Sequence, residues 1–201
     1  MRTAKTILTV IQERGKQKKP IERVYKLLFN RELYLNAYAK LYPNNGAMTK
    51  GVTDETVDGM SIQKIDRMIE ILREEKYQWK PARREYIKKK NGKKRPLGIP
   101  VWGDKVLQEV MRQILEAYYE PQFSEHSHGF RPNRGCHTAL QEIQVWKGTR
   151  WFVEGDISQY FDTIDHKILL EILARNIHDG RFIRLVSNML EAGYLEEWKF
   201  N

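Results

Sequence analysis

The stretch Glu85-Tyr-Ile-Lys-Lys-Lys-Asn-Gly-Lys-Lys-Arg95 is the part of the sequence from which the fold is most readily predicted. Asn91-Gly92 lies between two arms of strand-like sequence. An Asn-Gly pair is the strongest short signal for a tight hairpin, because both central residues of a type I′ turn need a positive φ. We therefore predict a β-hairpin that turns at Asn91-Gly92.

This hairpin is strongly basic. Residues 80–95 carry nine Lys or Arg and one Glu. Cations on a rigid hairpin can hold a triphosphate, where Arg95 binds in bidentate fashion and Lys89 acts as a point charge, or they can clamp the backbone of a template strand. The alternative is a solvated edge hairpin on which lysines deter strand pairing.

The chain before the hairpin is predicted to be helical. Apolar residues recur at helical spacing in residues 3–13 and 20–41, and the basic run 14–19 links the two helices. Residues 42–60 are predicted to form a loop, after which Ser61 caps an amphipathic helix that reaches about residue 75.

The chain after the hairpin alternates helices with loops and short strands. Helices are predicted at 103–120, 135–147, 165–176 and 180–192, and a loop at 124–134. Residues 151–157 have the apolar character of a short strand that ends near Asp156, and the last four residues resemble the start of another strand. No rhythm of parallel βαβ units is present, so the fold class is α+β.

The composition points to an anionic partner. The formal net charge is +9 and the isoelectric point is about 9.5. Nucleic acid is the favoured partner of such a chain, and an anionic membrane surface is a weaker alternative because the basic helices lack a large apolar face. The sequence shows neither a membrane-spanning stretch nor a secretion signal, and it has one cysteine, Cys136. We expect a cytoplasmic, bacterial location in preference to an organelle.

Asp156 is the first candidate for chemistry. A carboxylate at the open end of a short strand is well placed to bind Mg²⁺, which takes hard oxygen ligands. A capping or turn aspartate is the simpler interpretation of the spacing alone. Phe161 lies close enough in sequence to press against a nucleotide sugar, although core packing explains a Tyr160-Phe161 pair equally well.

Two other clusters are weaker candidates for chemistry. Asp162 and Asp165 are better explained as the acidic start of the next helix. His126, His128, Cys136 and His137 do not have the spacing of a common zinc site, and Cys136 has no evident base beside it.

Three blocks of the sequence resemble one known family. They are Arg95-Pro-Leu-Gly-Ile-Pro100; Ser127-His-Gly-Phe-Arg-Pro-Asn-Arg134 with Cys136-His-Thr-Ala-Leu140; and Glu154-Gly-Asp-Ile-Ser-Gln-Tyr-Phe-Asp-Thr-Ile-Asp-His166. In this order and spacing, over about residues 30–200, they are similar to group II intron-encoded reverse transcriptases, or maturases. The resemblance implies helix-rich polymerase fingers with a basic hairpin and the beginning of a right-hand palm sheet.

The resemblance also implies roles for single residues. Asp156 matches the first catalytic aspartate, a Mg²⁺ ligand, and the Ile157 carbonyl helps to bind that metal. Phe161 matches the aromatic residue that excludes a 2′-hydroxyl. Lys89 and Arg95 match residues that contact the incoming dNTP, although Lys88 stands where many members have proline, so the choice of Lys89 over its neighbours is open. Residues 25–60 match a region that grips template and intron RNA, and we expect RNA contacts from Lys16, Lys18, Lys19, Lys88, Lys90, Lys93, Lys94 and Arg131.

The resemblance divides the chain into an N-terminal helical extension (1–60), fingers (61–150) and a partial palm (151–201). The family's later Pro-Gln-Gly and Tyr-Ala-Asp-Asp blocks do not occur in this sequence. We therefore expect a fragment that binds group II intron RNA and a template or primer but is inactive alone, and that self-associates through exposed apolar surface. The alternative is a non-catalytic RNA-binding module.

Overall fold

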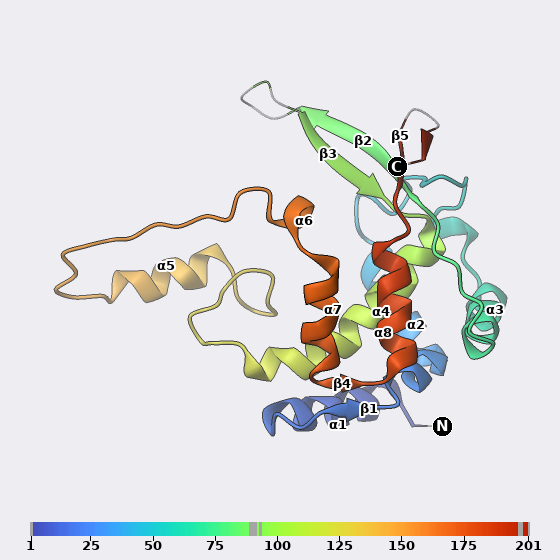
Figure 1. Ribbon diagram of the computed structural model, residues 1–201, viewed down its shortest axis with the longest axis horizontal. Coiled ribbons are helices and arrows are strands. Elements are labelled where there is room, and N and C mark those ends of the chain that lie inside the picture. The colour runs from blue at the N-terminus through green and yellow to red at the C-terminus, as the bar shows by residue number, and fades with distance from the viewer. Residues whose placement is uncertain (1, 89–91, 93, 197–198, 201) are drawn as a thin grey trace.

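The computed structural model describes residues 2–88, 92, 94–196 and 199–200 (Figure 1). The chain combines helices with small sheets. The helices are α1 (Ala4–Lys16), α2 (Arg31–Leu41), α3 (Ile62–Arg73), α4 (Trp102–Tyr119), α5 (Cys136–Gln144), α6 (Tyr160–Thr163), α7 (His166–Ala174) and α8 (Gly180–Leu190). The strands are β1 (Ile21–Glu22), β2 (Ala82–Lys88), β3 (Lys94–Ile99), β4 (Ile177–His178), β5 (Tyr194–Glu196) and β6 (Lys199–Phe200).

Helix α4 is the centre of the core. Its residues Val106, Leu107, Val110 and Ile114 are fully buried, as the apolar spacing predicted. Helices α1 and α2 pack against it. Gly15 makes the α1–α4 contact possible, because a Cβ atom at this position would lie 2.1 Å from the Tyr118 carbonyl oxygen. The core is therefore built mainly by helices around α4.

The predicted helix 20–41 is wrong in its first half. Ile21 and Glu22 form β1, which pairs in parallel with β4 and places Ile21 beside Ile177. Arg23 then has a positive φ of 54°, and Val24–Phe29 is a short 3-10 helix before α2 begins. Helix α1 also extends through the first half of the predicted linker. The cause is tertiary, because β1 forms on a partner more than 150 residues away, which local periodicity cannot reveal.

The predicted hairpin is confirmed, and it belongs to a larger sheet. The strand order is β3-β2-β5-β6, with β2 and β5 parallel and the outer pairs antiparallel. The register pairs Lys88 with Lys94. This register differs by one residue from the Lys88–Arg95 pair of a regular two-residue turn. Asn91 lies outside the described residues, so the turn at Asn91-Gly92 stays a prediction. Gly92 does have a positive φ, of 78°.

The C-terminal helices begin and end close to their predicted positions. Asp165 and Asp179 cap α7 and α8, and Ser61 caps α3 as predicted. The C-terminal part packs on the N-terminal part: the Asp179 carboxylate accepts from the Tyr25 backbone N–H at 2.9 Å, and the Trp79 indole donates to the Leu185 carbonyl at 3.0 Å. These contacts cross the predicted boundaries 60/61 and 150/151, and the division into three domains stays a prediction.

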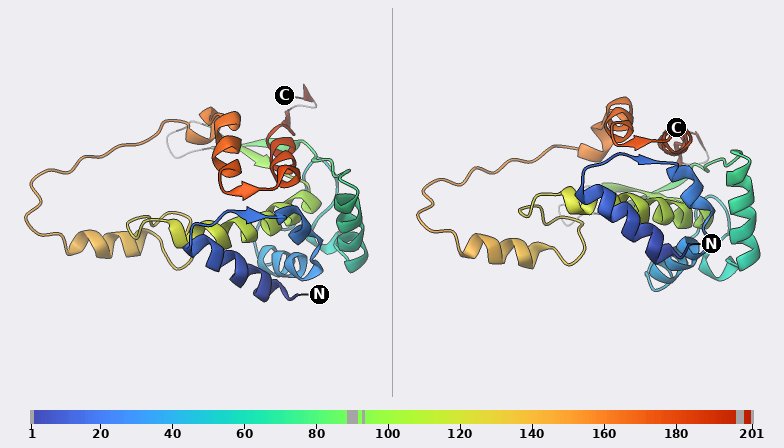
Figure 2. Two further views of the ribbon diagram at one scale, coloured as in Figure 1. Left: turned by 60° about the horizontal axis from the view of Figure 1, so that its bottom comes forward. Right: turned by 90° about the horizontal axis from the view of Figure 1, so that it is seen from below.

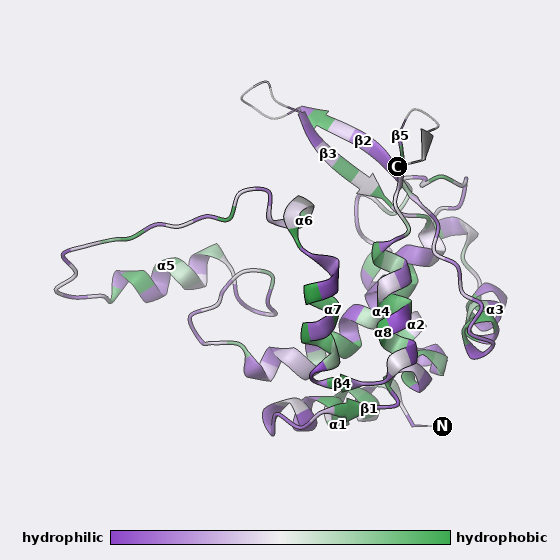
Figure 3. Ribbon diagram, in the orientation of Figure 1, coloured by the Kyte–Doolittle hydropathy of each residue, from purple (hydrophilic) through white to green (hydrophobic). Residues whose placement is uncertain are grey.

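Residues 135–159, called the arm below, extend away from this packed unit. Figures 1 and 2 show α5 and the returning chain as a long projection in every view. Figure 3 shows hydrophobic colour on α5, and helix α5 has no buried residue. The predicted strand 151–157 is not formed, since a strand needs a hydrogen-bonded partner and none of the described strands pairs with this segment. Within the described residues, no helix has the length and apolar character needed to cross a membrane.

Candidate nucleic-acid interface

The hairpin has two different faces because side chains alternate along a strand. Arg84, Tyr86 and Lys88 of β2 lie on one face, opposite Gly98, Pro96 and Lys94 of β3. This is called the tyrosine face below. Arg83, Glu85 and Ile87 lie on the other face, opposite Ile99, Leu97 and Arg95, and this is called the arginine face. The register therefore separates Arg95 from Lys88 and Lys94.

The tyrosine face combines an exposed aromatic ring with cations. The Lys94 ammonium lies 5.9 Å from the centre of the Tyr86 ring, and both residues are exposed. A hydrogen bond with Glu196 raises the pKa of the Tyr86 hydroxyl above its ordinary value. Nearer the base of the hairpin, the Arg84 guanidinium stacks 3.4 Å above the centre of the Tyr194 ring and fixes β2 to β5.

The arginine face is attached to the body at its base and exposed toward its tip. Arg83 donates from Nε and Nη2 to the Lys50 carbonyl at 3.1 and 2.9 Å, and it also pairs with Glu85. Ile87, Arg95 and Leu97 are exposed. This face thus offers Arg95 between two apolar side chains. Lys89, Lys90 and Lys93, which were predicted to bind dNTP or RNA, lie outside the described residues.

The predicted basic linker is far from the hairpin. Lys16 lies in the last turn of α1 and pairs with Glu13 at 2.7 Å, while Lys18 and Lys19 are exposed. Figure 1 shows α1 and the hairpin at opposite ends of the packed unit. The structure therefore does not bring the two predicted groups of RNA-binding lysines together.

Arg131 has protein partners. Its side chain is 8% exposed, and its guanidinium binds Glu120 and donates to the Ser124 and Ser127 carbonyls. The 124–131 loop is thus held to the end of α4. RNA binding by Arg131 stays a prediction that this burial does not support.

The candidate residues around Asp156 lie on the exposed return of the arm. Asp156 and Ile157 are in extended chain, and Phe161 in α6 is 78% exposed and contacts Tyr160 edge to face. Their oxygen donors, a carboxylate and a main-chain carbonyl, are of the type that Mg²⁺ prefers. Within the described part of the chain, no three metal-ligating side chains cluster. The donor type fits the metal, and metal binding by these residues stays a prediction.

The histidines near the arm form hydrogen bonds with residues of α5. His128 Nε2 lies 2.8 Å from the Glu142 carboxylate and its Nδ1 lies 2.8 Å from the Thr138 hydroxyl, and His126 also contacts Glu142. Hydrogen bonds from His128 and His126 lower the pKa of Glu142. These contacts fix the base of α5 to the preceding loop.

Sequence reasoning missed two aromatic residues of the sheet. Tyr86 became visible as an exposed ring beside Lys94 only through the register, and Tyr194 only through the pairing of β5 with β2. The alternation of Tyr86 with Lys88 in the sequence was the one available signal for the first. The second depends on a strand pair with more than 100 residues between its members.

A comparison with known protein families identifies the family of this chain. The family model described as "Reverse transcriptase (RNA-dependent DNA polymerase)" matches residues 87–200, from the hairpin to the last strand. The chain belongs to the reverse transcriptase family.

The names of the similar proteins refer to introns. The group II intron-encoded protein LtrA of Lactococcus lactis subsp. cremoris is 50% identical over 181 residues, which are 89% of this chain and 30% of LtrA. An uncharacterized 91 kDa protein in the cob intron of Schizosaccharomyces pombe is 45% identical over 205 residues, 98% of this chain and 25% of that protein. Nuclear intron maturase 1, mitochondrial, of Arabidopsis thaliana is 36% identical over 93 residues, 46% of this chain and 13% of that protein.

Within the family, the chain is similar to a group II intron-encoded protein and to an intron maturase. It spans less than a third of the length of each of these three relatives.

Proposed function

We propose that this chain forms the fingers and the first part of a right-hand palm of an RNA-directed DNA polymerase. In the complete protein, the polymerase copies RNA into DNA from dNTPs, and it binds its intron RNA to assist splicing. The observation that carries this proposal is the two-faced basic hairpin, which lies at the start of the matched reverse transcriptase region.

The two faces of the hairpin bind different ligands. Arg95 on the arginine face binds the triphosphate of an incoming dNTP, since a guanidinium forms paired hydrogen bonds with phosphate oxygens. Lys88 and Lys94 on the tyrosine face bind the RNA backbone, and the Tyr86 ring offers a surface on which a base stacks. The basic linker, Lys16 to Lys19, forms a separate phosphate contact at the far end of the packed unit.

Asp156 and its neighbours supply some of the ligands of the metal site. Mg²⁺, when bound, stabilises the charge that develops on the transferred phosphoryl group. Asp156 and the Ile157 carbonyl hold it, and Phe161 lies next to the sugar. A fixed geometry at Asp156 requires that the 151–157 segment pairs with further strands, so the chain alone binds RNA and does not extend primers.

A second candidate function is an RNA-binding module without catalysis. Asp156 is exposed, and no three metal-ligating side chains cluster among the described residues, which favours this function for the chain on its own. The two candidates differ in one respect: addition of the remaining palm sequence restores Mg²⁺-dependent extension only under the first.

We also propose that the isolated chain associates with itself in the cytoplasm of a bacterium. The arm exposes Trp151, Phe152 and Val153, an apolar run that water solvates poorly. Sedimentation of the chain at increasing concentration tests the association.

Binding of the chain to a structured domain of a group II intron RNA, compared with an unrelated duplex of equal length across a salt series, tests the proposed function. We expect a preference for the intron RNA that persists at higher salt. Equal and steeply salt-dependent binding to both RNAs would show that the chain contributes charge alone, and that recognition of the intron lies elsewhere.

A further inference from the structure

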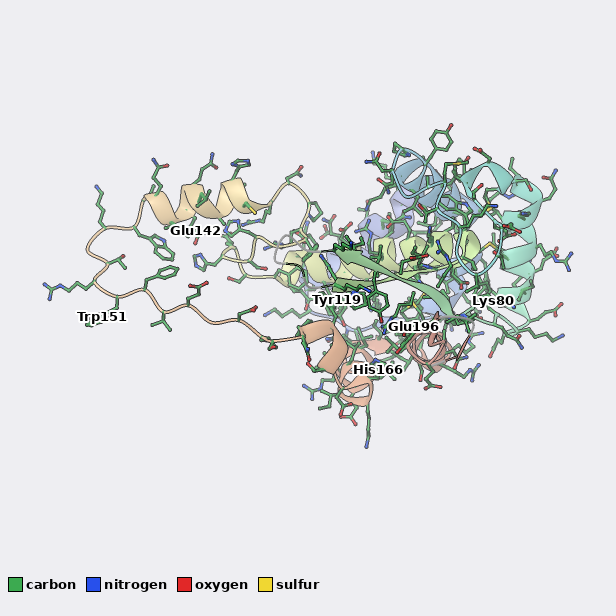
Figure 4. The ribbon with its side chains drawn as sticks, turned by 90° about the horizontal axis from the view of Figure 1, so that it is seen from above. Lys80, Tyr119, Glu142, Trp151, His166 and Glu196 are labelled. Atoms are coloured by element: carbon green, nitrogen blue, oxygen red, sulfur yellow. The ribbon has the colours of Figure 1, made fainter. Side chains whose placement is uncertain are left out.

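A pocket lies between α3, the chain that leads into the hairpin, and the start of α4. Its volume is about 540 Å³, which is within the range of small-ligand sites. The loop at residues 53–60 forms one wall. Figure 4 shows Lys80, one of the lining residues, at the opposite end of the molecule from Trp151 at the tip of the arm.

The interior of the pocket is apolar and aromatic. Met60, Met68, Ile71 and Trp102 contribute to the lining. Thioether and indole groups are polarisable and pack well against flat rings. Trp102 is 3% exposed, and its indole N–H has no hydrogen-bond partner among the described residues. Such orphaned buried donors are rare in folded proteins.

The polar residues of the pocket leave a net positive charge. The Asp104 carboxylate accepts hydrogen bonds from the Tyr77 hydroxyl at 2.6 Å and the Lys80 backbone N–H at 2.9 Å. Glu55 pairs with Lys64 at 3.1 Å. Arg67 and Lys80, in contrast, have no side-chain carboxylate within salt-bridge distance in the described part of the chain, so both cations are available to an anion.

We propose that this pocket binds one unstacked nucleotide of an RNA strand, with its base against Met68 and Trp102 and its phosphate toward Arg67 and Lys80. The combination of an apolar interior with free cations fits this ligand, because an unstacked nucleotide presents a flat ring beside a negative phosphate. Proteins that recognise RNA commonly bind bases that loops and bulges have released from stacking.

This inference rests on the proposed RNA binding and adds a second contact to that of the hairpin. The pocket does not include the exposed cations of the tyrosine face, Lys88 and Lys94. The hairpin contact requires only phosphates and a base of any identity that stacks on Tyr86. The pocket instead requires one base that is free to leave its helix, so it distinguishes RNAs of equal charge.

The test compares two short RNA hairpins by fluorescence anisotropy with the full chain. One has a single bulged adenosine, and the other has an abasic residue at the same place, so the number of phosphates is equal. We expect the adenosine bulge to bind about tenfold more tightly, the size of effect that one stacked base contributes. Equal affinities of the wild-type chain for the two RNAs would overturn the proposal.

Gly103→Leu tests the pocket without a change of charge. Gly103 lines it in the first turn of α4, and a Cβ atom there would have only Met68 Sδ nearby, at 3.9 Å. The new side chain fills the pocket, so we expect the preference for the adenosine bulge to disappear while binding of the abasic RNA is unchanged. Gly46→Leu is the matched control, because it adds the same side chain in open space outside the pocket.

Two further outcomes are informative. Failure to bind either RNA would refute the proposed function together with this inference, whereas equal binding refutes the pocket alone. A preference that micromolar adenosine 5′-monophosphate abolishes would identify a free nucleotide as the ligand and overturn the assignment to RNA. If Gly103→Leu does not fold, the wild-type chain can be tested with 2-aminopurine at the bulged position of the RNA. Quenching of the 2-aminopurine fluorescence on binding supports insertion of the base into the pocket, and unchanged fluorescence contradicts it.

Discussion

The packed unit and the arm respond differently to the same kind of sequence. Both contain runs of large apolar residues. In α4 these side chains are buried in the core that α4 forms with α1 and α2, whereas Trp151, Phe152 and Val153 of the arm are exposed. The apolar face of α4 finds its partners within the described chain, and the apolar run of the arm does not. An apolar pattern therefore specifies a buried element only when its partner is also present.

The largest expected effect is a loss of primer extension on substitution of Asp156, which lies in the arm. In a polymerase-competent protein that contains this chain, Asp156→Ala removes a metal ligand, and we expect primer extension to fall by more than about 100-fold. Because Asp156 is exposed in this structure, we expect the stability of the chain itself to change by less than about 0.5 kcal/mol.

Glu154→Gln is the matched control for this substitution, since it removes a neighbouring exposed carboxylate in the same segment. We expect it to retain extension. Primer extension by the Asp156→Ala protein at the wild-type rate would remove Asp156 from the metal site.

Two substitutions by alanine, one in the core and one in the arm, test the difference in packing between the packed unit and the arm. Ile114 is fully buried and Val153 is 93% exposed. We expect Ile114→Ala to lower the free energy of unfolding by about 2–5 kcal/mol, because it leaves a cavity beside α1 and α2. Val153→Ala should change it by less than about 0.5 kcal/mol. Urea denaturation measures both, and a large loss for Val153→Ala would mean that the arm is packed in solution.

Acid should weaken the packed unit through Glu109. Burial raises the pKa of this carboxyl, but its bonds with Arg112 and Lys40 outweigh burial, and the net pKa is lowered. A lowered folded pKa means that the stabilisation is present above the ordinary glutamate pKa and is lost as the pH falls through the folded value. We expect the free energy of unfolding to decline as the pH falls below about 5.

Glu109→Gln should be less stable than the wild type at neutral pH and equal to it in acid. Glu142→Gln is the comparison in the base of the arm. The pKa of Glu142 is also lowered, but its partners His128 and His126 hold only the 124–131 loop to α5. We expect this variant to follow the wild-type acid unfolding curve, and a curve shifted like that of Glu109→Gln would contradict the separation of the two regions.

Local signals in the sequence were sufficient for elements whose causes are local. Three such elements depend on neighbours within a few residues: the Ser61 cap, the apolar face of α4 and the two strands of the hairpin. The strand β1 depends on its pairing with β4, far along the chain, so periodicity predicted a helix there. The strand 151–157 was predicted from its composition, but composition does not supply the hydrogen-bonded partner.

The candidate site divides in the same way. The basic charge of the hairpin was evident in the sequence, but its separation into two faces came from the register of β2 and β3. Arg131 shows the opposite case, because its charge suggested RNA binding and its burial against Glu120 shows a contact within the protein. A charge count thus identifies the class of ligand and cannot say which cations face it.

The central claim is that the hairpin of the packed unit, and not the arm, binds RNA phosphate. The most direct test measures the salt dependence of RNA binding for two variants of equal charge, Lys88→Gln/Lys94→Gln in the hairpin and Lys147→Gln/Arg150→Gln in the arm. All four cations are exposed. We predict that the hairpin variant lowers the slope of log Kd against log salt by up to about 1.4–1.8 and that the arm variant leaves it unchanged. An equal or larger loss in the arm variant would contradict the account.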